Sequence, residues 1–499
     1  MLTRRRFLTS TAVAPAVMRA QPRSGRRPNF VLIYADDLGY GDLSSFGAAA
    51  HRTTRLDRMA GEGARFTDFY APMPYCAPSR AALLTGRYPF RSGMVFNPAP
   101  DGGINDIGLP AAEVTIAEAL KPAGYASICI GKWHLGHAEK FLPRTQGFDE
   151  YYGILYSNDM RPVQIVHNEK VEEYPVVQSR LTGGYTDRAI RFIEQNRERP
   201  FFVYLPHAMP HKPLAASEDH YTPETPGDLY SDVIRELDHN VGRLLDALKA
   251  LGLDDNTLVL FSSDNGPWFG GSTAGLRGMK GSSWEGGIRV PMIARWPGRI
   301  PAGRTCGEIA GVIDVLPTFC RLAGVAPPAD RVIDGRDIWP LMTDAGSKTP
   351  HEALYSMSAA QLQTIRSGKW KLHVRRPAPG FAHMDDEAAK RWVDQRGPDG
   401  VTLLAQHEQA RPNQYPGTQS GDPPKEMMLF DLEADRAEQR DVAAANPEVV
   451  ARLKALFDKM DAQVPRDLRL ERHGSGGGLL RLKGGSLRYD QLPKPPAQD

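Results

Sequence analysis

Short apolar runs rich in β-branched residues alternate along the chain with segments of helical spacing. Four such runs end at polar or charged residues: 30–34, 125–130, 201–205 and 257–261. Between the last two, apolar residues recur every three or four positions from Leu229 to Leu251, which predicts an amphipathic helix ended by Gly252. This alternation is typical of α/β folds, in which ligands bind beyond the carboxyl ends of the strands. We therefore expect an active site in the loops after these four strands.

The pattern changes after about residue 350. Short strands are predicted at residues 353–355, 364–365, 369–374 and 428–431. Pro447 opens a helix with apolar residues at helical spacing, whereas residues 376–425 are rich in charge, Pro and Gly and predict an insertion or long loop. We expect a catalytic domain over residues 27–350, a smaller α+β domain with a short antiparallel sheet over residues 351–465, and a flexible tail over residues 466–499.

The first 22 residues are not expected to belong to the fold. Arg5-Arg6-Phe7-Leu8 precedes a short, weakly apolar stretch and a small-residue segment. This arrangement resembles a bacterial twin-arginine signal peptide, which predicts a periplasmic or secreted protein. The alternative is a basic N-terminus without a targeting role.

Composition narrows the class of protein. The chain has 499 residues, of which 41% are hydrophobic and 24% charged. With 61 Lys and Arg against 59 Asp and Glu, the net charge of +2 does not favour nucleic-acid binding. No apolar run approaches the roughly 18 residues that a membrane helix needs. These values indicate a soluble enzyme and leave its oligomeric state open.

The chain contains four cysteines, too few and too widely spaced for a disulfide framework or a zinc site. Cys306 and Cys320 could form a disulfide in an oxidising compartment, but their spacing does not decide this. Cys129 lies in an apolar run and is expected to be a buried small hydrophobe. Cys76, in contrast, does not lie in such an apolar run.

Two tandem pairs of oxygen-bearing side chains follow two of the predicted strands. Asp36-Asp37 follows the first and Asp264-Asn265 the fourth. Three carboxylates and one amide suit a hard divalent cation, either Ca²⁺ or Mg²⁺. Each pair alone would be explained by a helix cap or an Asx-turn. Two pairs at matching positions favour a metal site.

Cys76 is expected at the N-terminus of a short helix. Pro78 is typical of the first helical turn, and Gly86 is typical of the position after the last one. The partial positive charge of a helix N-terminus favours an anion, and Arg80 lies about one turn further on. The residues alone leave two alternatives: a low-pKa thiol nucleophile, or a buried Cys beside a surface Arg.

Motifs in a fixed order extend over nearly all of residues 27–465. They include Asp36-Asp37-Leu38-Gly39-Tyr40-Gly41-Asp42, Cys76-Ala77-Pro78-Ser79-Arg80, Gly131-Lys132-Trp133-His134, Ser263-Asp264-Asn265-Gly266 and Lys280-Gly281. With them the chain resembles the type I, formylglycine-dependent sulfatases, and most of all the arylsulfatase A and N-acetylgalactosamine-6-sulfatase group. The resemblance implies an alkaline-phosphatase-like fold, in which helices flank a large mixed sheet.

The resemblance also implies a reaction. Cys76 would be converted by a formylglycine-generating maturation enzyme to formylglycine (3-oxoalanine), whose hydrate attacks a sulfate monoester and forms a covalent sulfated intermediate. The products are an alcohol and inorganic sulfate. The metal, usually Ca²⁺, would be bound by five residues that match the family's ligands: Asp36, Asp37, Cys76, Asp264 and Asn265.

The remaining roles are implied residue by residue. Arg80 and Lys132 would hold the aldehyde hydrate and its sulfated form, and His134 would remove the proton that expels sulfate. Lys280 and His211 would bind sulfate and protonate the leaving oxygen. Two further residues match substrate-binding positions. These are Ser157, alternatively a turn serine, and His207, alternatively a hydrogen-bonded loop residue.

Two other functions stay open. A phosphoryl or phosphonyl hydrolase would share the fold and metal site, and a secreted binding protein would keep an unmodified Cys76. The sequence also does not decide between an aryl sulfate and a sulfated carbohydrate as substrate. Contacts with the leaving group are expected from the loops at residues 97–107, 160–180, 267–277 and 376–425.

Overall fold

The computed structural model describes residues 25–98, 107–160, 163–222, 229–268, 270–377 and 420–465. The expected signal peptide, the expected tail and most of the 376–425 insertion lie outside these ranges, so export and the role of the insertion stay predictions. Within the ranges, no helix has both the length and the apolar character needed to cross a membrane.

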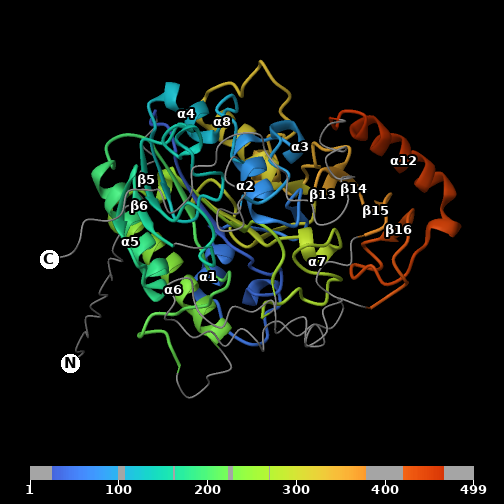
Figure 1. The fold of residues 1–499 in the computed structure, drawn as a ribbon, viewed down its shortest axis with the longest axis horizontal. Helices are drawn as coiled ribbons and strands as arrows, with labels where there is room; N and C mark the ends of the chain where they lie inside the picture. The colour runs from blue at the N-terminus through green and yellow to red at the C-terminus, as the bar shows by residue number, and fades with distance from the viewer. Residues whose placement is uncertain are drawn as a thin grey trace, which may run out of the picture.

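A ten-stranded mixed sheet forms the larger part of the molecule (Figure 1). Its strand order is β11-β2-β10-β9-β1-β8-β4-β5-β6-β7. The strands are β1 (Asn29–Ala35), β2 (Ala64–Phe66), β4 (Ala126–Ile130), β5 (Glu150–Gly153), β6 (Ile165–His167), β7 (Lys170–Glu173), β8 (Phe201–Pro206), β9 (Thr257–Ser263), β10 (Met292–Arg295) and β11 (Arg304–Cys306). The four strands predicted from the sequence are β1, β4, β8 and β9, which are parallel neighbours at the centre of the sheet. Their carboxyl ends therefore share one edge.

Helices cover both faces of this sheet because successive side chains of a strand point to opposite faces. In β1, Val31 and Ile33 pack in one apolar cluster, and Leu32 and Tyr34 pack in another on the opposite face. The first face is covered by α1 (Thr54–Gly61), α5 (Leu181–Gln195) and α6 (Leu229–Ala250). The second is covered by α2 (Cys76–Thr85), α4 (Ile116–Leu120) and α8 (Val315–Ala323). The predicted α/β architecture is confirmed.

Shorter elements complete this part of the chain. They are α3 (Pro89–Ser92), α7 (Glu285–Ile288), α9 (Trp339–Thr343) and the two-stranded parallel sheet of β3 (Phe69–Tyr70) and β12 (Ala310–Gly311). All four cysteines are buried free thiols, so Cys306 and Cys320 form no disulfide. Cys129 is fully buried among apolar side chains in β4, as predicted.

The C-terminal part forms a second, four-stranded antiparallel sheet, as predicted. Its elements are β13 (Leu354–Ser358), β14 (Gln361–Ser367), β15 (Trp370–His373) and β16 (Met428–Asp431), with α12 (Pro447–Asp461) packed against β14 and β15. In Figure 1 these elements, in orange and red, lie at one end of the molecule, with α7 between them and the large sheet. Apolar side chains of both sheets share one buried cluster, so the domain boundary near residue 350 stays a prediction.

A buried charged group joins the small sheet to α7. The Lys371 ammonium of β15 donates to the Ser283 carbonyl at 2.9 Å and to Glu285 Oε1 at 2.9 Å, and it lies 3.0 Å from Glu438 Oε1. His373 Nε2 donates to the same Glu438 oxygen at 2.6 Å. Burial alone would raise the pKa of Glu438, but Lys371 and His373 outweigh it and lower that pKa to about 2. Lys371 is thus the main counter-charge of both carboxylates, although Glu285 also pairs with Arg289 at 3.2 Å.

Lys371→Met is expected to destabilise the protein by about 3–5 kcal/mol, because it leaves two buried carboxylates without their main counter-charge. Equilibrium unfolding in urea measures this change. The matched control is Lys369→Met, which breaks a partly exposed ion pair with Asp431 and should cost at most about 1 kcal/mol. Equal, small effects of both substitutions would show that the buried group contributes little.

Candidate active site

The predicted site residues follow the four central strands and meet at one edge of the large sheet. Backbone hydrogen bonds tie the loops together there: Asp36 N–H donates to Met209 O at 3.2 Å, His207 N–H to Tyr34 O at 2.8 Å, Lys132 N–H to Pro206 O at 2.8 Å and Asp264 N–H to Ala35 O at 3.2 Å. Strand order thus brings together side chains that are more than 200 residues apart in sequence.

Two of the site residues have a left-handed backbone although they are not glycine. Asp37 has φ 60° and His134 has φ 57°, each just after a strand. This conformation costs roughly 1–2 kcal/mol for an L-residue, and such residues cluster at functional sites. Between β4 and Lys132, Gly131 has φ 126°, and a Cβ there would lie 2.0 Å from Pro206 O. The β4 loop therefore requires glycine at this position.

Four oxygen-bearing side chains form a buried group. Asp36, Asp37, Asp264 and Asn265 are at most 1% exposed. Asn265 Nδ2 donates to Asp37 Oδ1 at 2.7 Å, and Asp37 N–H donates to Asp264 Oδ1 at 3.1 Å. Asn265 Oδ1 is buried and accepts no hydrogen bond from any described residue. A spare amide oxygen among three carboxylates fits a hard divalent cation such as Ca²⁺ or Mg²⁺.

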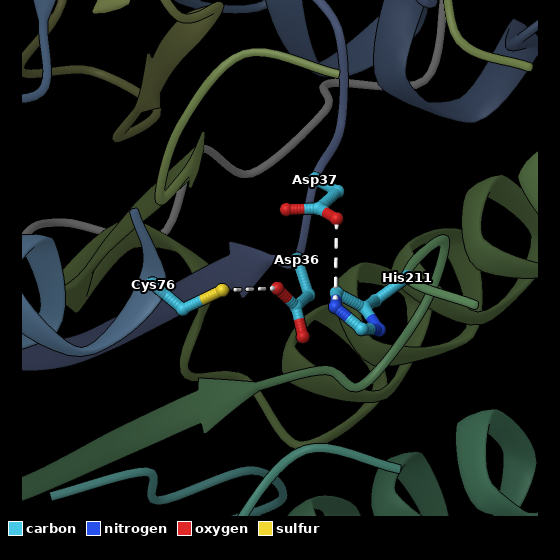
Figure 2. A group of neighbouring side chains, drawn as sticks. All are labelled: Asp36, Asp37, Cys76 and His211. Carbon is cyan, nitrogen blue, oxygen red and sulfur yellow. Dashed lines mark hydrogen bonds and ion pairs between the residues drawn. The ribbon is translucent and has the colours of Figure 1, made fainter. Parts of the chain in front are cut away.

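Cys76 and His211 adjoin this oxygen group (Figure 2). The Cys76 thiol donates to Asp36 Oδ1 at 3.4 Å, and His211 Nε2 lies 3.6 Å from Asp37 Oδ2. One potential ligand atom from each of Asp36, Asp37, Cys76 and His211 falls within 4.8 Å of the others. The structure therefore brings together all five residues predicted to bind metal and adds His211 to their neighbourhood.

Arg80 is fully buried and faces two of these carboxylates. Its Nε and Nη2 donate to Asp264 Oδ2 at 3.0 and 2.8 Å, and Nη2 lies 3.6 Å from Asp36 Oδ1. Nη1 donates to the Lys132 carbonyl at 2.8 Å. Arg80 thus neutralises Asp264 and fixes the β4 loop, and the predicted alternative of a surface Arg is wrong.

Two buried lysines add positive charge. Lys132 Nζ donates to Asp36 Oδ2 at 2.5 Å and to Ser157 Oγ at 3.0 Å, and Lys280 Nζ donates to Asp37 Oδ2 at 2.7 Å. Burial opposes their charge, but Asp36 and Asp37 outweigh it and raise the pKa of Lys132 and Lys280 respectively. Both lysines are therefore cations at neutral pH.

The two candidate acid–base histidines have defined hydrogen bonds. His134 Nε2 lies 3.1 Å from the Pro98 carbonyl, which can only accept, so Nε2 carries the proton. Its Nδ1 is buried and has no partner in the described part of the chain. Burial, followed by the charges of Lys132 and Arg80, holds the pKa of His134 well below its usual value. The His134 ring is therefore neutral, with a free acceptor at Nδ1.

His211 is held by the carbonyl of its own neighbour and lies beside Ser157. Its Nδ1 donates to Lys212 O at 2.5 Å, and Ser157 Oγ lies 3.3 Å from Nδ1 and 3.5 Å from Nε2. Burial, followed by Lys280 and Lys132, lowers the pKa of His211 well below its usual value. Ser157 therefore bridges Lys132 and His211, within the group predicted for it.

His207 differs from His134 and His211 in its hydrogen bonding. It is buried, and neither ring nitrogen has a hydrogen-bond partner among the residues described. Burial lowers its pKa to about 3, and its ring centroid lies 6.3 Å from that of Tyr185. No hydrogen bond joins its ring to the cluster in these ranges, so its role in binding substrate stays a prediction.

Two contributors were missed from the sequence. Asn97 Oδ1 accepts from the Ala77 N–H at 3.0 Å, in the first turn of α2, and the Pro98 carbonyl orients His134. A backbone carbonyl carries no side-chain signal, and Asn97 lies 20 residues from its partner. Neither contact could be predicted from local pattern.

Known proteins are similar to this chain over most of its length. The chain matches the model of the Sulfatase family over residues 28–325, more than half of its length. It is 39% identical to N-acetylgalactosamine-6-sulfatase of Canis lupus familiaris over 379 residues, 69% of this chain and 71% of the relative. It is 38% identical to arylsulfatase A of Homo sapiens over 475 residues, 86% of this chain and 87% of the relative.

A solved structure supports the same relationship. The protein described as "Crystal structure of Ps i-CgsB" superposes with a TM-score of 0.73 at 29% identity, covering 88% of this chain and 94% of that chain. Similarity therefore extends from the sequence to the fold.

Proposed function

The chain belongs to the sulfatase family, and from that membership we propose that it hydrolyses a sulfate monoester through a nucleophile formed at Cys76. As a sulfatase it is a sulfuric ester hydrolase of the arylsulfatase type. One observation carries the proposal for this site: Cys76 begins α2 and contacts Asp36 within a buried group that contains three cations.

The nucleophile would be the hydrate of formylglycine, which supplies an oxygen that attacks sulfur and later releases sulfate as the aldehyde re-forms. Cys76, Pro78 and Arg80 match the family's conversion motif. Because Cys76 is only 1% exposed, the maturation enzyme would act before the chain folds. The N-terminus of α2 favours the negative charge that develops at position 76.

Cations around position 76 would bind the sulfate group. Arg80, Lys132 and Lys280 are positively charged and buried, where charge stabilisation is stronger than in water. Ser157 contacts Lys132 and would donate a further hydrogen bond. These groups are pre-positioned by ion pairs with Asp36, Asp37 and Asp264, so little reorganisation is needed when substrate binds.

A divalent cation would be held by Asp36, Asp37, Asp264 and Asn265, whose oxygens suit Ca²⁺ or Mg²⁺. Bound there, it would supply Lewis-acid polarisation of a sulfate oxygen. The buried, unpartnered Asn265 Oδ1 supports this assignment.

Two histidines would move protons. His134 Nδ1, the free acceptor, would take the hydroxyl proton at position 76 whose removal expels sulfate. His211 lies beside Ser157 and Asp37, on the side away from Cys76. The negative charge of a bound sulfate ester would raise the pKa of its ring, so that Nε2 takes up a proton and then delivers it to the leaving oxygen.

Metal removal tests the cation site without an activity assay. EDTA-treated protein should unfold at a lower temperature, and Ca²⁺ at about a hundredfold excess over its Kd should restore about 2–3 kcal/mol. Differential scanning calorimetry measures the shift. Asp37→Asn should lose the Ca²⁺ response, whereas Asp246→Asn, at an exposed position, should keep it. An unchanged unfolding temperature with either cation in the wild type would contradict the site.

The reaction itself is tested by product analysis. Protein co-expressed with a maturation enzyme should release sulfate from p-nitrocatechol sulfate or from sulfated sugars, and release far less phosphate from the matching phosphate monoesters. Phosphate release without sulfate release, from protein whose Cys76 is converted, would contradict the proposal and favour the phosphohydrolase alternative.

A further inference from the structure

Two oppositely charged residues that do not pair with each other flank the Ser157–His211 contact in sequence. Asp159 follows Ser157 by two residues, and Lys212 directly follows His211. The side-chain amide of Asn158, the neighbour of Asp159, bonds the backbone on both sides of Lys212, which brings the two charged residues close together. Burial lowers the pKa of the Lys212 ammonium, and the charge of Asp159 opposes this shift. Yet no ion pair joins the two side chains in the described ranges. The pair therefore stands at the leaving-group side of the proposed reaction, close to its sulfate-binding residues.

The structure holds Lys212 in place without neutralising it. Its ammonium lies 5.4 Å from the ring centroid of Trp268, a residue that follows the Asp264-Asn265 loop. Asn158 Nδ2 donates to the carbonyls of His211 and Pro213 at 3.4 and 3.1 Å, which fixes the backbone on both sides. Its side chain is partly exposed, so at least two donor hydrogens are free for a ligand.

Asp159 also has an atom without a hydrogen-bond partner, in its case an acceptor. Its Oδ1 is shielded from solvent and accepts no hydrogen bond from a described residue. A carboxylate oxygen shielded from water and without a donor costs free energy, so Oδ1 is available to accept a hydrogen bond from a ligand. A second anionic group on the substrate would suit Lys212 but would be repelled by Asp159. A hydroxyl group suits both residues, because it donates to a carboxylate and accepts from an ammonium.

We infer that Asp159 and Lys212 bind two hydroxyl groups of the leaving alcohol, so that the substrate is a sulfated carbohydrate and not a simple aryl sulfate. The inference rests on the proposed sulfatase activity of this site. Neighbouring hydroxyls on a sugar ring each combine a donor and an acceptor, whereas the leaving group of p-nitrophenyl sulfate has neither of these hydroxyls. The pair would therefore distinguish the two substrate classes after sulfate has been recognised by other residues.

Paired substrates test this directly. Sulfate release is measured as kcat/KM with p-nitrophenyl sulfate and with N-acetylgalactosamine 6-sulfate, galactose 6-sulfate and fucose sulfates, for wild type, Asp159→Ala and Lys212→Met. Each substitution should lower kcat/KM for the best sugar about 10- to 100-fold, the effect of losing one charged hydrogen bond, and change that for p-nitrophenyl sulfate less than about threefold. Activity on the aryl sulfate also shows that each variant folds.

Matched controls are Asp219→Ala and Lys170→Met, which remove the same charges from exposed positions and should change neither value. Equal losses on both substrate classes, or no loss on sugars, would overturn the inference. A wild type that prefers p-nitrophenyl sulfate to every sugar would also overturn it, while leaving the proposed activity intact. Failure of the converted wild type to release sulfate from any substrate would instead refute the proposed function itself.

Discussion

Cys76→Ala is expected to lower sulfate release by about 10⁴- to 10⁶-fold, because it removes the atom from which the nucleophile is made. The other proposed groups would remain: Arg80, Lys132 and Lys280 make their ion pairs with carboxylates and not with the thiol. Substrate binding should therefore persist without turnover. Initial rates of sulfate release and equilibrium binding of a sulfated sugar measure the two properties separately.

The matched control is Cys320→Ala, which deletes a thiol that is equally buried but lies in α8, away from the site. It should retain activity within a few-fold. Both substitutions remove one buried sulfur and should cost at most about 2 kcal/mol of stability. Substantial sulfate release by folded Cys76→Ala would show that the nucleophile comes from elsewhere.

Arg80→Ala is expected both to abolish activity and to destabilise the protein by about 3–5 kcal/mol. The guanidinium makes two hydrogen bonds to Asp264 and is fully buried, so its removal leaves a carboxylate without its counter-charge. Ca²⁺ bound to Asp264 would replace part of that charge, so the loss should be larger in EDTA than in Ca²⁺. Urea unfolding in the two buffers measures both values.

Arg80→Lys and Arg58→Ala provide the comparison. Lysine keeps the positive charge but lacks the planar guanidinium, whose Nε and Nη2 both donate to Asp264. Arg80→Lys should therefore lose less stability than Arg80→Ala while still losing most activity. Arg58 makes surface ion pairs with Glu62 and Asp246, and its loss should cost at most about 1 kcal/mol. If Arg80→Ala were as mild as Arg58→Ala, Arg80 would not be the counter-charge that its contacts indicate. Because Arg80 belongs to the conversion motif, the state of residue 76 is checked by mass spectrometry in each variant.

The central elements were predictable because their signals are local. Each of β1, β4, β8 and β9 is a buried apolar run that stops at polar residues, and the apolar stripe of α6 has strict helical spacing. Gly86, with φ 68°, ends α2 where the sequence placed the end. The site followed from the rule that carboxyl ends of parallel strands meet at one edge.

Other elements were not predictable because their stability comes from distant partners. The sequence predicted strand only at residues 364–365 of β14, whereas the strand extends from Gln361 to Ser367. It contains polar residues that are buried, among them Arg366, which pairs with Asp68 nearly 300 residues away. Similarly, no sequence pattern predicts that Lys371 contacts both Glu285 and Glu438.

Prediction of the candidate site from the sequence is limited for the same reason. Motifs pointed to the residues proposed to act on the sulfate ester, including Cys76, Lys132 and His134, because the family resemblance rests on them. The carbonyl of Pro98, and the unpaired Asp159 beside Lys212, depend on how loops fold over the sheet edge. Residues that would select the substrate therefore became visible only in three dimensions.

Sulfate hydrolysis is expected to depend on conversion of Cys76, which can be measured in the protein itself. Preparations made with different amounts of maturation enzyme are analysed for the fraction of converted Cys76, from the mass of its peptide, and for the rate of sulfate release. We expect the rate to rise in proportion to the converted fraction, as a straight line through zero. Full activity in protein that carries the unmodified thiol would contradict it.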